Sequence, residues 1–129
     1  MLYLDTSAFM KPFTREPEAQ AVAELLEERE EELISSLLLD VEAARVAGRI
    51  GGAAPAIVDQ ALGRIRRVQI NAAIVANAAL ILPGSKLGAL DAIHLATALS
   101  IPEDTTVVTY DIRLQEACRQ VGLPVLAPA

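Results

Sequence analysis

The sequence predicts an α/β fold, a three-layer α/β/α sandwich with a mainly parallel central sheet. Short apolar segments alternate along the chain with longer segments that have the period of an α-helix. Strands that are separated by helical crossovers pair in parallel, and the helices then cover the sheet. The chain has 129 residues, 53 % of them hydrophobic. This length is enough for one core but not for two, so we expect a single domain over residues 1–129.

The expected strands are short and apolar. The first is "LYL" at residues 2–4, and "LISS" at residues 33–36 runs directly into a helical segment. The later segment "TTVVTY" is β-branched and bounded by polar residues, which is typical of a strand. We expect strands at residues 2–4, 33–36, 68–70, 105–110 and 123–127.

The segments between these strands have helical periodicity. In residues 18–31, Ala19, Val22, Ala23 and Leu26 follow the helical period, and glutamates occupy the other side. Pro55 is acceptable in the first turn of a helix, and glycines or prolines end four of the helical segments. Such stop signals are Gly48 or the Gly51–Gly52 pair, Pro83–Gly84, Pro102 and Gly122. We expect helices at residues 18–31, 37–48, 56–67, 72–81, 87–100 and 111–122.

The composition indicates a partner and a reducing compartment. A small monomer does not easily bury this much apolar side chain, so we expect a homodimer or a tightly held partner. No segment resembles a secretory signal, and no apolar run is long enough to span a bilayer. Cys118 is the single cysteine and fits a packed structural thiol better than a nucleophile. We therefore expect a cytoplasmic protein with no membrane partner.

The net charge of −6 does not exclude a nucleic-acid partner, because the negative charge is concentrated in one segment. Residues 16–32 contain eight glutamates and one arginine, and the rest of the chain is close to neutral. Such an acidic segment is usually a solvated helix face. A polyanion could still bind elsewhere on the protein.

Two predicted strands end on a carboxylate. Asp5 follows "LYL" and Asp111 follows "VVTY", and each passes directly into a helix. Either aspartate could be a helix N-cap, as could Thr6 or Ser7. However, the carboxyl ends of parallel strands meet at one edge of the sheet, where ligands bind in open α/β folds. The cap and the ligand site are both open interpretations of these residues.

Two further carboxylates lie in predicted helices. Glu42 borders an apolar seam that we expect to include Leu38, Val41 and Ala44, whereas Asp40 should face solvent. Asp91 stands among apolar residues, where a carboxylate must be paired, hydrogen-bonded or bound to a metal. His94 follows it by three residues on the same face. It could bind a ligand or orient a carboxylate, although a packing role is more common for such a histidine.

Four stretches of the chain, "LYLDTSAFMKPF", "SSLLLDVEAARVAG", "LDAIHLATAL" and "VVTYDIRLQEACRQVGLPVL", resemble the PIN-domain nucleases, and most closely the VapC toxins of VapBC toxin–antitoxin pairs. The resemblance implies a PIN-like fold and an acidic cleft that binds Mg²⁺ or Mn²⁺ and hydrolyses RNA. It assigns the four acidic positions to Asp5, Glu42, Asp91 and Asp111, as metal-binding and catalytic residues. It assigns the supporting hydroxyl to Ser7. Many relatives carry another acid after the fourth, but here Ile112–Arg113–Leu114 follows, so a second metal ion would be held more weakly.

The same resemblance implies the partners. These are an RNA substrate, a cognate VapB-like antitoxin and a second copy of the chain. Since aromatic residues make up only 3 % of the chain, we expect RNA contacts from basic residues near the cleft. The candidates are Arg45, Arg49, Lys11 and Arg113.

Two other classes of metal-using protein also place acids at strand ends. A haloacid-dehalogenase-type phosphatase needs a second aspartate two residues after the first, where this chain has Ser7. A response-regulator receiver needs an acidic pair after the first strand and a lysine after a late strand, and this chain has neither. A non-catalytic PIN-like protein-binding module stays open as the alternative.

Overall fold

The computed structural model describes residues 1–129 and contains one five-stranded, fully parallel sheet. The strands are β1 (Leu2–Leu4), β2 (Leu33–Ser36), β3 (Arg66–Val68), β4 (Thr106–Val108) and β5 (Val125–Leu126). Their order across the sheet is β3-β2-β1-β4-β5. The predicted parallel sheet is therefore confirmed.

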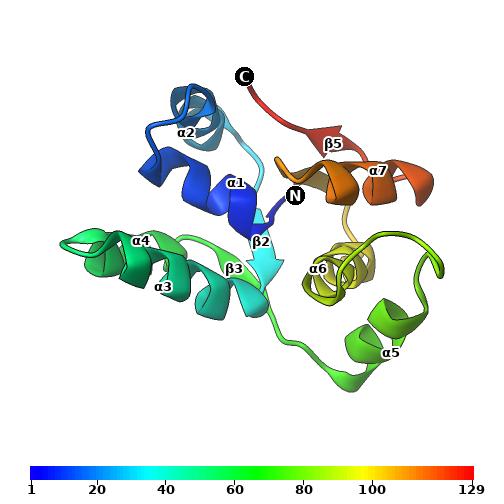
Figure 1. Cartoon of the computed structure of the whole chain (residues 1–129). Coiled ribbons are helices and arrows are strands. Elements are labelled where there is room, and N and C mark those ends of the chain that lie inside the picture. The colour runs from blue at the N-terminus through cyan, green and yellow to red at the C-terminus, as the bar shows by residue number, and fades with distance from the viewer.

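Seven α-helices and one short 3₁₀-helix connect the strands. They are α1 (Thr6–Met10), η1 (Lys11–Phe13), α2 (Glu18–Glu28), α3 (Leu38–Ile50), α4 (Ala54–Leu62), α5 (Ala72–Leu80), α6 (Ala89–Ser100) and α7 (Ile112–Gln120). Figure 1 shows α1 to α4 on one side of the sheet and α5, α6 and α7 on the other. None of these helices is both long and apolar enough to cross a membrane.

The three central strands, β2, β1 and β4, contribute side chains to two separate cores. Leu2 and Leu4 pack into the core beneath α1 to α4, whereas Tyr3 between them packs into the core beneath α6 and α7. Strand β4 alternates in the same way, with Val108 in the first core and Val107 in the second. Because successive side chains of a strand point to opposite faces, this alternation produces the predicted three layers.

Several expected segment boundaries were wrong. The helix predicted at residues 56–67 ends at Leu62, and the strand predicted at 68–70 instead occupies Arg66–Val68. This strand pairs with Ile34–Ser36 of β2, and the pairing overrides the local helical pattern. Pairing in the sheet also limits the strand predicted at 105–110 to Thr106–Val108, which leaves Thr109 beyond the ladder.

The expected apolar seam of α3 was also wrong. Its buried positions are Leu39, Ala43 and Ala47, which recur every four residues, whereas Val41 is 58 % exposed. The burial of Ala43 places the neighbouring Glu42 at the border of the core, where its side chain is 22 % exposed. Asp40, expected in solvent, is only partly exposed, with Oδ1 3.6 Å from Arg67 Nε.

The helix layers change sides between β1 and β4. The chain from β1 through β2 to β3 uses helices of one face, whereas β4 and β5 are reached through α5, α6 and α7 on the other face (Figure 1). At such a switch point the connections leave the sheet in opposite directions, and a crevice forms beyond the carboxyl ends of the strands. Asp5 and Asp111 both lie at this edge.

Candidate active site

Asp5 is a buried carboxylate held by three hydrogen bonds. Its Oδ1 accepts from Ser7 Oγ at 2.7 Å and from the Ala8 amide at 3.0 Å, and its Oδ2 accepts from Thr109 Oγ1 at 2.6 Å. The bond from Ala8 makes Asp5 the N-cap of α1. Only 3 % of the residue is exposed, and this burial raises the pKa of Asp5 above its usual value despite the three donors. Asp5 is thus both the N-cap of α1 and a rigidly held acid at the edge of the sheet.

Ser7 joins the ends of β1 and β4. Besides donating to Asp5, its Oγ accepts from the Tyr110 amide at 2.9 Å and lies 3.3 Å from Thr109 Oγ1. The supporting role that the resemblance implied for Ser7 therefore has a local physical basis. Its hydroxyl orients the carboxylate and anchors the segment that leads to Asp111.

Asp111 caps α7 with one of its oxygens. Oδ1 accepts from the amides of Arg113 and Leu114 at 2.9 and 3.2 Å. The Asp111 amide donates to Thr109 Oγ1 at 3.1 Å, which ties the cap to the same hydroxyl that holds Asp5. The second carboxylate oxygen has no hydrogen-bond partner in the protein.

Asp91 lies in the first turn of α6 and accepts no hydrogen bond from the protein. The pKa of Asp91 is raised to about 6, mainly by burial and also by the negative charges of Asp111, Asp5 and Glu42, against the opposing effect of His94. A charge acts appreciably on a pKa only over a short distance. The charges of Asp111, Asp5 and Glu42 therefore lie near Asp91 at the carboxyl edge of the sheet.

Glu42 is held by donors from two other elements. Its Oε1 accepts from Thr6 Oγ1 at 2.6 Å and from His94 Nε2 at 2.8 Å. Burial raises the pKa of Glu42, but these two hydrogen bonds outweigh burial and lower it below the usual value. Glu42 is thus kept ionised at neutral pH, and its Oε2 has no partner in the protein.

Sequence reasoning named neither Thr109 nor Tyr3 as a part of the site. Thr109 donates to Asp5 from the end of β4, and Tyr3 Oη lies 2.7 Å from His94 Nδ1. The position of Thr109 between an apolar strand and Asp111 was a usable signal. No such signal in the sequence pointed to Tyr3, because tyrosines are common within buried strands.

The donor set suits a hard divalent cation. Each of the four carboxylates keeps at least one oxygen lone pair that no protein donor uses, and oxygen is the ligand that Mg²⁺ and Mn²⁺ prefer. No three of these side chains are close enough together to hold an ion as a group. Mg²⁺ keeps several waters and needs only one or two carboxylates directly, so carboxylates spaced in this way fit it.

The four basic residues expected to contact RNA differ in their surroundings. Lys11 is already engaged, because its Nζ lies 2.5 Å from Glu16 Oε2 and 4.5 Å from the centre of the Tyr110 ring. Arg113 is exposed two residues after Asp111, at the start of α7. Arg45 and Arg49 are exposed on α3.

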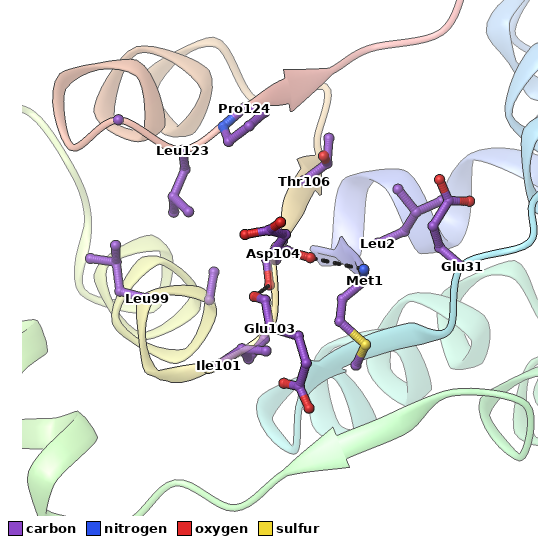
Figure 2. Close-up of a pocket in the computed structure, with 13 residues that line it drawn as sticks. Met1, Leu2, Glu31, Leu99, Ile101, Glu103, Asp104, Thr106, Leu123 and Pro124 are labelled. Carbon is purple, nitrogen blue, oxygen red and sulfur yellow. Dashed lines mark hydrogen bonds between the residues drawn. The ribbon is translucent and has the colours of Figure 1, made fainter.

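A cavity of about 560 Å³ lies at the opposite edge of the sheet (Figure 2). It is lined by residues that precede or begin strands, among them Met1, Leu2, Thr106 and Pro124. The Met1 ammonium group donates to the Asp104 carbonyl at 2.9 Å there. None of the four acids lines this cavity.

The sequence matches the PIN domain family over residues 2–120. Ribonuclease VapC35 of Mycobacterium tuberculosis is 41 % identical over 132 residues, which cover 99 % of this chain and 97 % of that protein. Ribonuclease VapC46 of the same species is 36 % identical, with 99 % of this chain and 98 % of that protein covered.

Two solved structures share the fold. The M. tuberculosis VapC20 structure, described as a sarcin-ricin loop cleaving toxin, superposes with a TM-score of 0.79 at 13 % identity, over 99 % of this chain and 100 % of that one. A toxin–antitoxin complex from Klebsiella pneumoniae superposes with a TM-score of 0.75 at 22 % identity, over 100 % and 98 % of the two chains. At these identities the likeness concerns the fold alone.

Proposed function

We propose, because this chain belongs to the PIN-domain family and within it to the VapC type, that it is a Mg²⁺- or Mn²⁺-dependent endoribonuclease, the toxin of a type II toxin–antitoxin pair. One observation carries the proposal. Carboxylates at the ends of β1 and β4 and on α3 and α6 gather at the switch point, and each keeps an oxygen lone pair that no protein donor uses.

The proposed roles follow from how each carboxylate is held. Asp5, fixed by three donors, and Asp91, free of donors, would be the direct ligands. Glu42 and Asp111 would act through water, and one of them would position the water that attacks the phosphorus. A bound divalent ion would neutralise the phosphate and lower the pKa of that water. Attack forms a new P–O bond as the bond to the leaving ribose oxygen breaks.

The direct test is cleavage of a labelled RNA by the purified protein. We expect cleavage with Mg²⁺ or Mn²⁺, no cleavage with EDTA and none by Asp5→Asn. Asp59→Asn, an exposed acid on α4, is the matched control and should cleave normally. A parent protein that binds partners but cleaves no RNA in either metal would favour the alternative, the non-catalytic binding module.

The proposed homodimer is supported by apolar side chains exposed on adjacent helices. Val75 and Leu80 of α5 are 52 % and 75 % exposed, and Leu90 and Leu99 of α6 are 51 % and 42 % exposed. Only Ile74 of α5 is buried. A second copy packed on these helices would remove this apolar surface from water.

The proposed antitoxin partner is supported by a groove of about 380 Å³ between η1, α2 and α4. Apolar side chains, including Phe9, Phe13 and Leu26, line it, with Arg29 and Arg64 among its polar residues. An amphipathic helix of a VapB-like antitoxin could lay its apolar face there and place an arginine in the acidic cleft, in competition with metal.

We place this enzyme in the cytoplasm and treat the whole chain as one PIN-like domain. Cys118 supports a reducing compartment, because it is the single cysteine and has no partner in the chain for a disulfide. It is fully buried in the core beneath α6 and α7. Burial raises the pKa of its thiol to about 11, so the residue has the properties of a structural thiol.

A further inference from the structure

A buried hydrogen-bond chain connects β1, α6 and α3 behind the cleft. Tyr3 Oη lies 2.7 Å from His94 Nδ1, and His94 Nε2 lies 2.8 Å from Glu42 Oε1. Tyr3 is fully buried and His94 is 2 % exposed. The two rings also meet edge to face, with centroids 5.8 Å apart. Every polar atom of the imidazole is therefore engaged, and none can bind a ligand.

The direction of each hydrogen bond follows from the donors available. An ionised Glu42 can only accept, so the Nε2–H group of His94 donates to it. In the neutral ring Nδ1 is then an acceptor and receives the hydroxyl proton of Tyr3. Tyr3 thus selects the tautomer of His94 that can hold Glu42.

His94 is also linked to the cleft through its own helix. It follows Asp91 by three residues, which places both on one face of α6. Helix α6 therefore carries Asp91 in its first turn and, one turn later, His94, which is hydrogen-bonded to the Glu42 carboxylate of α3. Thr6, next to Asp5, donates to the same Glu42 oxygen at 2.6 Å. Glu42 Oε1 is saturated by these two donors, and Oε2 is the oxygen left for other partners.

We propose that His94, oriented by Tyr3, is a positioning residue that fixes Glu42 with Oε2 available to the divalent cation site. This inference rests on the proposed function, because it assigns His94 a role in that same site. A group that orients a metal ligand typically changes metal affinity or activity by 10- to 100-fold when it is removed. Removing a merely structural histidine would lower stability without changing metal affinity.

The test measures Mn²⁺ affinity without RNA and, separately, kcat and KM for RNA cleavage. Tyr3→Phe keeps the ring and removes only the hydroxyl, and His94→Leu removes both hydrogen bonds. We expect His94→Leu to weaken Mn²⁺ binding by roughly tenfold or more and to lower kcat while KM for RNA stays the same. Tyr3→Phe should show a smaller loss in the same direction.

Two further variants separate positioning from stability. His94→Gln places an amide N–H near the position of Nε2, so it should recover part of the lost affinity. Ala98→Gly, one turn further along α6, should lower Tm without changing Mn²⁺ affinity. In a Glu42→Gln background, His94→Leu should cause no further loss, because the two residues act as one unit.

Since His94 is the only histidine, its ring nitrogens give a single pair of NMR signals. We expect one protonated and one unprotonated nitrogen, and a changed shift in Tyr3→Phe. The inference is overturned if the parent binds Mn²⁺ and cleaves RNA while Tyr3→Phe and folded His94→Leu match it in both. If His94→Leu does not fold, unchanged affinity and kcat in Tyr3→Phe overturn it. A parent that neither binds Mn²⁺ nor cleaves RNA would instead defeat the proposed function, and the inference with it.

Discussion

Thr109 Oγ1 donates a 2.6 Å hydrogen bond to Asp5 Oδ2, and this bond joins the carboxyl ends of β4 and β1 across 104 residues of sequence. The same hydroxyl oxygen accepts from the Asp111 amide at 3.1 Å. One threonine therefore sets the positions of two of the four acids. Its loss should affect both the stability of the fold and the charge of Asp5.

The variant Thr109→Val should lose roughly 1–3 kcal/mol of stability at neutral pH, because a buried carboxylate loses a donor. The pKa of Asp5, already raised by burial, should rise further. Because protonated Asp5 needs that donor less, the loss should shrink as the pH falls. Urea unfolding of the parent and the variant at two pH values measures this loss of unfolding free energy. Thr105→Val, a buried threonine just before β4, is the matched control. Equal losses in the two variants at both pH values would contradict the proposed role of Thr109.

The metal-free protein should become more stable as the pH falls from about 6 towards about 4. Burial and neighbouring acids raise the pKa of Asp91 to about 6 from its usual 3.8. In this window the folded state binds more protons than the unfolded state, so stability decreases as the pH rises. Protonation of Asp5, whose pKa is also raised, changes stability in the same direction. Glu42 has a lowered pKa, so its protonation changes stability only at pH values below its usual pKa of 4.5.

Asp91→Asn should flatten this pH dependence and melt higher than the parent at neutral pH without metal. The amide keeps the shape of the side chain and removes the charge that Asp111, Asp5 and Glu42 repel. Thermal melts of the parent and the variant across this pH range measure the effect. A lower Tm for Asp91→Asn at neutral pH, with an unchanged pH slope, would show that Asp91 stabilises the start of α6 instead.

The exposed face of α5 should mediate self-association. Val75→Glu places a charge on a side chain that is 52 % exposed in one chain, so the fold should persist while a dimer separates. Light scattering after size exclusion should give twice the mass of one chain for the parent and the mass of one chain for the variant. Ile57→Glu, at a similarly exposed apolar position on α4, should stay dimeric. A monomeric parent would contradict the proposed interface.

RNA binding should depend on salt, and Arg113 should account for part of that dependence. Each phosphate that a basic residue neutralises releases counterions, which steepens the fall of affinity with salt. Arg113→Gln should weaken binding of RNA to the inactive Asp5→Asn protein and reduce the salt slope by about one contact. Arg66→Gln, on the edge strand β3, is the control. If the salt dependence of RNA affinity were the same with and without Arg113→Gln, Arg113 would not contact the RNA.

The parallel sheet and the capping acids could be predicted because local patterns determine them. "LYL" before Asp5 and "VVTY" before Asp111 each contain a strand and the cap of the next helix within a few residues. The third strand was misplaced because Arg66–Val68 is a strand only through its pairing with β2. The pattern of apolar and polar residues does not indicate that β2 is the pairing partner of this strand.

The site was less accessible to local reasoning. Glu42 came from the family resemblance. Its apolar neighbours were wrongly chosen because the burial of α3 depends on its packing against α4 and α1. The partner of Glu42 is His94, 52 residues away, so no local pattern could indicate it. The role of Thr109 likewise depends on the pairing of β1 with β4.

Acids from four elements, in the function proposed here, serve one divalent cation site. The measurement is Mn²⁺ binding to the metal-free parent and to Asp5→Asn, Glu42→Gln, Asp91→Asn and Asp111→Asn, followed by the EPR signal of free Mn²⁺. We predict that the parent binds Mn²⁺, that all four variants bind it more weakly, and that the remote Asp59→Asn control matches the parent. A parent that binds no Mn²⁺, or four variants that all bind it as the parent does, would contradict the claim.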